Sequence, residues 1–477
     1  MKRTRPTFNR LKTAPFVLAL TVALLIPSVL RAEIRFFPPF SDSMVVQRDR
    51  PVRMMGEASP NEKLTVTLGG SSAETVTGRN GVWSVTLDPL PAGGPFELVV
   101  SGRKDQAKLT DVMVGDVWLC VGSDLMSRTP DENFSLPTGA NDLNGLRLLK
   151  VEATCAEKPK TMFHGEWQLA SADTIGAFSA VAFVFGRELN RRLGVPIGIV
   201  AASSGHSTAE AWTSPVDFDK TPLLEPLVEP ARNENKPNEQ RSGALWNGTL
   251  APLTALTIRG AVFDPGTMNA GRAYQFRTLI ETLIHQWRAA WGEGDFPFYY
   301  VNLEAFPTER DGRTQSAAAE LREALCRAES LRRVRGIVTA DLGRPSSTEK
   351  IGERLAALAV WDEYKAEDIG TGPTLREMKI EKDRAVLFFD FLGGGLATSD
   401  GGQATGFFLA GTDGEFFPAD AAMESNRVTV TSKFVPTPAA VRYNWADGNV
   451  GNLQNIDGFP APPFRTDHGP GVTEYGR

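Results

Sequence analysis

The chain has 477 residues, with 51 Lys and Arg against 57 Asp and Glu and a formal net charge of −6. This length allows two to four domains, each with a core of its own. The acidic balance repels polyanions, so we expect no nucleic-acid partner.

Residues 1–32 have the layout of a secretory leader, with six basic residues, no acidic residue and the apolar run "APFVLALTVALLIPSVL". We expect cleavage after Ala32. Leu30, two residues before Ala32, is larger than the small residue usual at that position of a cleavage site, so an uncleaved membrane anchor remains the alternative. Cleavage leaves 45 Lys and Arg against 57 acids, a formal charge of −12. The prediction is a secreted or periplasmic protein with no membrane contact beyond this leader, because no later segment is apolar for long enough to span a bilayer.

Residues 33–110 are predicted to form a small antiparallel β domain. The runs "KLTVTL", "GVWSVTLDPL" and "PFELVVSG" alternate apolar and polar residues and are separated by "GG", "GRNG" and "PAGG". Period-two runs between glycine and proline turns are typical of a β-sandwich.

Residues 111–366 change to strand–helix alternation, which predicts a parallel sheet covered by helices. The strand-like runs are "VGDVWLCVG", "VPIGIV", "TIRGAVF", "FPFYYVNLEAF" and "GIVTADL". The helical patterns cover Ala177–Leu193, Tyr274–Trp291, Gln315–Leu331 and Glu349–Tyr364. Gly194 stands where a C-terminal helix cap belongs. Sheets of this kind place their sites at the carboxyl ends of the strands.

Residues 367–477 return to short alternating runs, "AVLFFDF", "ATGFFLAG", "RVTVTS" and "AAVRYNW", and are predicted to form a second β domain. The glycine run "LGGG" lacks the Gly-Lys-Ser/Thr of a phosphate loop and is interpreted as a turn.

Cysteine and histidine are scarce. Cys120, Cys155 and Cys326 are too few and too scattered for a disulfide framework or a metal cluster. We interpret Cys120 and Cys326 as packing residues, and we expect no metal and no cofactor. The chain has four histidines, His164, His206, His285 and His468. We place His285 on a helix surface or in packing, and His164 and His468 have no partner spacing for a metal or a triad.

Several segments together resemble the sialate O-acetylesterase family. They include "FSDSMVVQRDRPVRMMGEASPNEKLTVTLGG", "VGDVWLC", "TIGAFSAVAFVFGRELNRRLGVPIGI", "AEAWTS", "WNGTLAPL" and "VRYNWADGNVGNLQNIDGFPAPPFRTD". The resemblance covers nearly the whole chain after the leader. It implies an SGNH-hydrolase-like three-layer α/β/α central domain between N- and C-terminal β-sandwich-like domains. It also implies acyl transfer: a serine in a Gly-Gln-Ser-Asn segment attacks an acetyl ester, with a histidine as its base and backbone N–H groups and an amide holding the oxyanion.

The first catalytic block departs from that pattern. The family's "LCSGQSNMEW" aligns with "LCVGSDLMSR", which keeps Gly122 but places Asp124 at the nucleophile position and Ser123 at the glutamine. A carboxylate attacking an acetyl ester would only form an anhydride, so Asp124 is a poor substitute for the serine. Ser123 lies one residue off, and in a tight turn that shift points its side chain elsewhere.

The second and third blocks are also altered. The family's "SWGGTPAEAW" aligns with "SSGHSTAEAW", which keeps Gly205 as an oxyanion donor and brings in His206. The family's "WYQGESN" aligns with "FDPGTMN", which keeps Gly266 and Asn269 as oxyanion or pocket residues and places Pro265 where the family has glutamine. Proline removes one backbone donor.

The fourth block lacks its base. The family shows "DIGDPKDIHPKNKQEVGRRLAL", and this chain reads "DLGRPSSTEKIGERLAAL" from Asp341, with no histidine between His285 and His468. Losing a nucleophile or a base typically costs several orders of magnitude in rate. Four altered blocks beside intact packing segments favour a catalytically impaired homologue that binds carbohydrate or acts as a scaffold.

Two enzymatic alternatives stay open. One is an active carbohydrate O-acetylesterase in which Ser123 or Ser203 works with His206. The other is a glycosidase-like or metal-assisted hydrolase built on Asp124 and Asp264, against which both can be solvated turn aspartates. We expect a carbohydrate or acetylated glycan as partner. Trp212, in the loop near the family's pocket, is the candidate for stacking on it, whereas Trp118 and Trp287 are interpreted as core.

Overall fold

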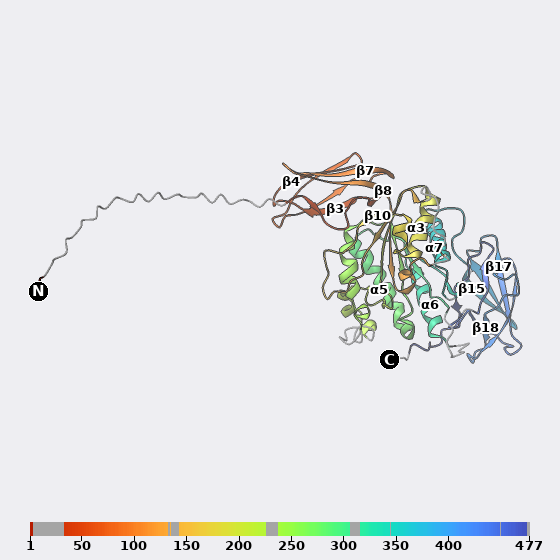
Figure 1. Ribbon diagram of the computed structural model, residues 1–477. Helices are drawn as coiled ribbons and strands as arrows, with labels where there is room; N and C mark the ends of the chain where they lie inside the picture. Colours follow the sequence, from red (N-terminus) through yellow and green to blue (C-terminus); the bar gives the residue numbers. More distant parts are fainter. Residues whose placement is uncertain are drawn as a thin grey trace.

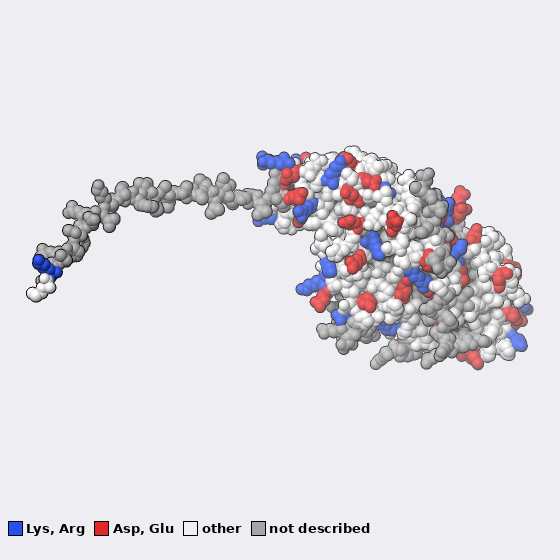
Figure 2. All heavy atoms as spheres, viewed as in Figure 1, with Lys and Arg blue, Asp and Glu red and all other residues white. Residues whose placement is uncertain are grey.

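A computed structural model describes residues 1–2, 33–131, 134, 143–225, 237–305, 315–343, 345–448 and 450–474. Most of the predicted leader lies outside the described residues. Among those described, no helix combines the length and the apolar character needed to cross a bilayer. Figure 1 shows the N-terminal strands at one end of a central sheet and the C-terminal strands beside it. On the face shown in Figure 2, acidic and basic side chains are interspersed rather than segregated.

The N-terminal strands belong to two sheets, whose buried apolar residues join one large cluster. One sheet has the order β1 (Arg35–Phe36), β3 (Val52–Glu57), β6 (Val82–Leu87). The other joins β5 (Ser71–Val76), β4 (Lys63–Leu68) and β7 (Gly93–Ser101) to the first half of β8 (Gln106–Gly122), with β2 (Val45–Gln47) parallel to β8. The predicted alternation is confirmed in β4, which buries Leu64, Val66 and Leu68 while its other residues face outward.

Strand β8 continues from the N-terminal sheet into the central one, across the boundary predicted after residue 110. The central path has the order β10-β9-β11-β8-β12-β13-β14. Its other strands are β9 (Leu146–Lys150), β10 (Trp167–Leu169), β11 (Ile197–Ser203), β12 (Gly260–Asp264), β13 (Phe298–Val301) and β14 (Val334–Ile337). All of these pairings are parallel except that of β10, so the predicted α/β class is confirmed.

Helices cover both faces of the central sheet. Trp118 and Cys120 of β8 pack in one apolar cluster with α3 (Ala180–Leu193) and α7 (Thr348–Asp362). Val117, Leu119 and Val121 point the other way, into the cluster of α5 (Ala273–Trp291) and α6 (Ala317–Arg327). A strand alternates its side chains between faces, so both faces of β8 are apolar. The predicted cap is confirmed, because α3 ends at Gly194 with φ 63°.

The remaining elements of the central region are short. They are α1 (Asp124–Ser127), α2 (Ala172–Ile175), the 3₁₀ turns η2 (Pro215–Lys220), η3 (Pro222–Leu224), η4 (Asn238–Gln240), η6 (Ala251–Ala255), η7 (Ala270–Arg272), η8 (Ala328–Ser330) and η9 (Ala340–Leu342), and the π turn η5 (Trp246–Leu250). Trp118 and Trp287 are buried and His285 is exposed on α5, as predicted.

The C-terminal strands form two four-stranded sheets and a ribbon around a third cluster. One sheet has the order β15 (Thr374–Glu381), β16 (Arg384–Asp390), β21 (Arg427–Thr431), β20 (Asp420–Met423). The other has the order β19 (Phe416–Pro418), β18 (Phe407–Ala410), β22 (Ala440–Tyr443), β24 (Phe464–Arg465). The ribbon pairs β17 (Leu396–Thr398) with β23 (Leu453–Asn455).

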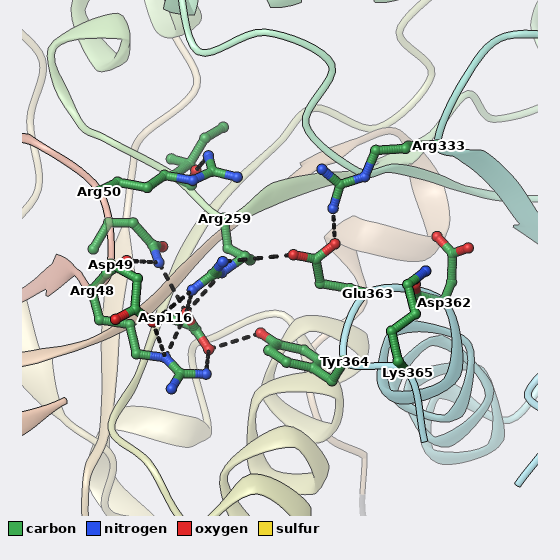
Figure 3. Close-up of polar contacts among 12 residues, drawn as sticks. Arg48, Asp49, Arg50, Asp116, Arg259, Arg333, Asp362, Glu363, Tyr364 and Lys365 are labelled. Carbon is green, nitrogen blue, oxygen red and sulfur yellow. Dashed lines mark hydrogen bonds and ion pairs between the residues drawn. The ribbon is translucent and has the colours of Figure 1, made fainter. Parts of the chain in front are cut away.

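A buried carboxylate joins the N-terminal and central regions (Figure 3). Asp116, at the start of the central part of β8, is fully buried and accepts hydrogen bonds from four side chains: Gln47, Arg48, Arg259 and Tyr364. Burial alone would raise the pKa of Asp116, but hydrogen bonds from Arg48 and the charge of Arg259 lower it below its usual value. The ionised carboxylate therefore connects three segments through its hydrogen bonds: the β2–β3 turn with Arg48, the residue before β12, Arg259, and the segment after α7 with Tyr364.

Candidate functional site

The three central strands that carry the predicted catalytic blocks end side by side. In the parallel register, Gly122 of β8 pairs with Ser203 of β11 and with Asp264 of β12. The loops after these strands therefore meet at the carboxyl edge of the sheet, where sites of α/β proteins lie. The first loop continues directly into the single-turn helix α1.

Ser123 points into the protein rather than into solvent. Its side chain is fully buried, and a Cβ atom on Gly266 would lie 2.6 Å from its Oγ. The backbone N–H of Ser123 donates to the carbonyl oxygen of Asp264 at 2.9 Å. Its hydroxyl has no hydrogen-bond partner among the described residues. The Ser123 hydroxyl therefore lies inside the fold.

Asp124 lies against the second loop, with its side chain 35% exposed. Its Oδ1 accepts a hydrogen bond from the backbone N–H of His206 at 2.8 Å. The Nδ1 of His206 lies 3.7 Å from the same oxygen, and this imidazole is 79% exposed. A Cβ atom on Gly205 would lie 3.3 Å from that oxygen, so the carboxylate packs directly on the Gly205–His206 turn. A carboxylate of the chain itself therefore occupies one backbone donor of the second loop, the N–H of His206, next to the predicted oxyanion donor Gly205.

Asp264 is a buried cap for the first loop, not a solvated turn residue. Its side chain accepts hydrogen bonds from the N–H groups of Leu125 (2.8 Å), Met126 (3.1 Å) and Gly266 (3.0 Å). Burial raises the pKa of Asp264 to about 6, against the opposing effect of these three hydrogen bonds. The solvated interpretation is wrong for Asp264, which is 1% exposed and shielded from any substrate.

Asn269, the predicted oxyanion amide, is used inside the fold. It is fully buried, its Oδ1 accepts from the N–H of Ala209 at 3.0 Å, and its Nδ2 donates to Glu210 at 2.9 Å. Arg272 pairs with the other oxygen of Glu210 at 2.9 Å. This Asn269–Glu210–Arg272 chain holds the second and third loops together. The retained segment "AEAW" marks Glu210 in the sequence. Its bond to Asn269 could not be predicted, because the two residues are 59 positions apart.

Trp212 does not offer a stacking surface to a glycan. Its side chain is 1% exposed, and its Nε1 donates to Ser207 Oγ at 2.9 Å. Its carbonyl oxygen accepts from the indole of Trp287 at 3.0 Å. A ring that is 1% exposed leaves no area for a sugar, so the expected glycan contact of Trp212 is corrected to a packing role.

Around the fourth block, an ion pair missed by the sequence reasoning joins two loops. Arg128, just after α1, donates to both carboxylate oxygens of Glu304 at 2.8 and 2.9 Å, and Glu304 also accepts from the N–H of Ser346 at 2.7 Å. Burial alone would raise the pKa of Glu304, but the hydrogen bonds from Arg128 and Ser346 lower it. Asp341 pairs with Arg354, at 2.7 and 2.6 Å. Glu304 and Asp341 are therefore each paired with an arginine.

A cavity of about 530 Å³ opens beside this ion pair. Its lining is rich in hydroxyl groups and includes Ser127, Thr129, Ser346, Ser347 and Thr348. The volume falls within the range of about 300–1,000 Å³ common for small-molecule sites. The described residues contain no group of three or more metal-ligating side chains.

Comparison with solved structures relates the fold to that of a carbohydrate esterase. No protein-family model matches the sequence. The crystal structure of a carbohydrate acetylesterase from Xanthomonas citri superposes with a TM-score of 0.80 and 31% sequence identity, and the match covers 91% of this chain and 100% of that one.

The chain is also similar to curated sialate O-acetylesterases. Rat sialate O-acetylesterase is 29% identical over 352 residues, 61% of this chain and 65% of the rat protein. Human sialate O-acetylesterase is 27% identical over 322 residues, 60% of this chain and 61% of the human protein. The chain thus spans about three fifths of the length of the curated relatives it matches. It belongs to the sialate O-acetylesterase family, which confirms the resemblance drawn from the sequence.

Proposed function

We propose that this family member binds carbohydrate at the carboxyl edge of the central sheet and does not hydrolyse acetyl esters through a serine–histidine pair. The observation that carries the proposal is the contact of 2.8 Å between Asp124 Oδ1 and the backbone N–H of His206. An oxyanion formed during ester hydrolysis needs free donors of this kind. Here the N–H of His206, next to the predicted donor Gly205, already donates to a carboxylate that also stands at the nucleophile position.

The chemistry of the site supports the loss of hydrolysis in three further ways. Ser123 is buried, and its hydroxyl has no hydrogen-bond partner, the exposed His206 imidazole included, in the described part of the chain. Both polar atoms of the Asn269 amide are already hydrogen-bonded, Oδ1 to the N–H of Ala209 and Nδ2 to Glu210. Asp264, the second member of the carboxylate pair considered from the sequence, is buried under three backbone donors.

The cavity beside α1 supports carbohydrate binding. Its hydroxyl-rich wall can exchange hydrogen bonds with sugar hydroxyls, and the ion pair with Glu304 holds Arg128, one of its lining residues, in place. The central domain is assigned to the SGNH-hydrolase type, with helices on both faces of the sheet as support. The β regions are assigned as sandwich-like domains at 33–110 and 367–477. Export rests on the basic and apolar pattern of residues 1–32.

One observation favours the rival function, an active O-acetylesterase with a rearranged site. The imidazole Nδ1 of His206 lies 3.7 Å from Asp124, which resembles the base and the orienting acid of a triad. Ser203, half-buried at the end of β11, would then have to supply the hydroxyl.

Hydrolysis is tested with an O-acetylated sialic acid, an O-acetylated xylo-oligosaccharide and a fluorophosphonate probe. We expect no acetate release above the blank and no covalent label for the wild-type protein, because the Ser123 hydroxyl is buried and has no base as hydrogen-bond partner among the described residues. Turnover or labelling that is lost in Ser123→Ala, Ser203→Ala or His206→Ala would overturn the proposal.

Binding at the cavity is tested by calorimetry with the same acetylated sugars and their deacetylated forms. Thr129 is exposed at the cavity wall, so Thr129→Trp should block the cavity and weaken binding at least about tenfold, equivalent to about 1.4 kcal/mol. The matched control is Leu169→Trp, at an exposed position on β10 outside the cavity lining. Equal affinities of the two variants would contradict binding at this cavity.

A further inference from the structure

A second cleft lies in the C-terminal region, on the outer face of the β19-β18-β22-β24 sheet. One face of this sheet packs into the C-terminal core through residues such as Leu409, Val441 and Tyr443. The opposite face carries Phe416, Ala440, Arg442 and Arg465 and lines a cavity of about 530 Å³. The walls come from the loop at 411–414, the start of α6 and the tail at 466–472. This cleft shares no lining residue with the cavity beside α1.

The floor of the cleft is a stack of arginine and aromatic side chains. The guanidinium carbon of Arg442 lies 4.1 Å from the ring centroid of Phe416 and 5.3 Å from that of Trp445. Arg465 lies 5.2 Å from the Trp445 ring. Asp467 accepts from Arg442 Nε at 2.8 Å and from its Nη2 at 3.0 Å, which fixes the guanidinium plane. The floor is therefore rigid before any ligand arrives.

The charges of the floor balance within the cleft. Burial alone would raise the pKa of Asp467, but the hydrogen bonds and charge of Arg442 lower it, so Asp467 is ionised at neutral pH. Glu320 supplies the second negative charge of the lining and accepts hydrogen bonds from the backbone N–H groups of Val472 and Thr473. Arg465 donates to Glu323, just outside the lining, at 3.3 Å. A charged ligand would disturb these pairs in a partly desolvated place, at a cost that an uncharged ligand avoids.

Polar side chains at the rim have spare hydrogen-bonding capacity. Thr412, His468 and Gln315 are exposed at the cleft and make no side-chain hydrogen bond to another residue of the described chain. The half-buried ring of Phe416 adds an apolar surface between them. Convergent hydroxyl, imidazole and amide groups around an aromatic ring suit a ligand with hydroxyls at its edges and C–H groups on its faces.

We propose that this cleft, defined by Phe416, Arg442 and Asp467 on its floor and Thr412 and His468 at its rim, is a second ligand site that binds a neutral saccharide unit. The site is independent of the one at Asp124. It would hold a glycan chain on the C-terminal region whether or not the carboxyl edge of the central sheet binds or hydrolyses anything.

Calorimetric titration of the full chain tests the site, with cellohexaose, xylohexaose and mannohexaose as neutral probes and a galacturonic acid hexamer as the acidic one. We expect binding of at least one neutral hexaose and none of the acidic hexamer. Thr412→Trp fills the mouth of the cleft and should weaken binding at least about tenfold. His468→Ala removes one or two hydrogen bonds and should weaken it about three- to tenfold.

Two control variants distinguish binding at this cleft from binding elsewhere on the chain. His164→Ala removes another exposed histidine, outside the cleft lining, and should leave the affinity unchanged. Thr129→Trp should also leave neutral-hexaose binding at the cleft unchanged, so failure of the central site and failure of the cleft are distinguishable. Binding that survives Thr412→Trp and His468→Ala, binding of the acidic hexamer alone, or no binding of any neutral hexaose would overturn the proposal.

Discussion

Asp116→Asn is expected to lower the free energy of unfolding by about 3 kcal/mol. The carboxylate is fully buried and accepts six hydrogen bonds, five of them from Gln47, Arg48 and Arg259 and the sixth from Tyr364. Removing one partner of a buried ion pair typically costs about 3–5 kcal/mol, because the remaining charge is left uncompensated. The lower end applies here, since the side chains of Arg48 and Arg259 are 21% and 13% exposed and keep some contact with water.

The matched control is the neighbouring carboxylate, Asp49. It lies 3.7 Å from Arg48 and from Arg259 but is 58% exposed, so Asp49→Asn should cost less than about 1 kcal/mol. Urea unfolding followed by tryptophan fluorescence measures both variants, and an unchanged slope with a lower midpoint for Asp116→Asn indicates a change in stability. Two variants with the same midpoint would refute the role given to the Asp116 network.

The pH dependence of stability provides a second readout for Asp116. Its folded-state pKa is lowered, so the stability it contributes is present above the unfolded pKa of about 3.9 and is lost as the pH falls through the folded pKa. Asp116→Asn should therefore differ from the wild type most at neutral pH and approach it in acid. A difference that grows toward low pH would contradict this assignment.

The remaining predictions concern the carboxyl edge of the central sheet. Asp264 has a folded pKa of about 6, above about 3.9 for the unfolded chain, so the stability from its protonated form is present below pH 4 and is lost as the pH rises through 6. Asp264→Asn should abolish this decrease in the free energy of unfolding, which amounts to about 3 kcal/mol. Urea unfolding of both proteins at several pH values from 4 to 7 measures it. A difference in the free energy of unfolding between the two proteins that stays constant over this pH range would contradict the prediction. Gly266→Ala should cost at least about 2 kcal/mol, because Gly266 has φ 62° and a Cβ would lie 2.6 Å from Ser123. Gly271→Ala, where a Cβ meets nothing within 4 Å, should cost under about 1 kcal/mol in the same thermal melts, and equal costs would contradict the clash.

The sequence by itself determined the elements and the class of fold. The alternation in β4 depends only on neighbours one and two positions away, and so could be predicted from "KLTVTL". The end of α3 at Gly194 follows from the left-handed backbone that glycine permits. The meeting of Gly122, Ser203 and Asp264 at one edge follows from parallel strands, whose carboxyl ends point the same way.

The altered catalytic blocks were also visible in the sequence, because each is a short motif compared position by position. The identity of the residue at the nucleophile position, Asp124, needs no coordinates. What that carboxylate contacts does need them: its bond to the His206 N–H joins residues 82 positions apart. The missed Arg128–Glu304 pair joins residues 176 positions apart.

Only the tertiary structure decided burial, and burial decided the roles of the candidate residues. Trp212 and Asp264 have sequence surroundings typical of accessible loops, yet both are 1% exposed. The raised pKa of Asp264 and the lowered pKa of Asp116 arise from which distant groups surround each carboxylate in the fold. Solvent access and local charge depend on segments brought together by chain folding, whereas helix and strand patterns depend on near neighbours along the chain.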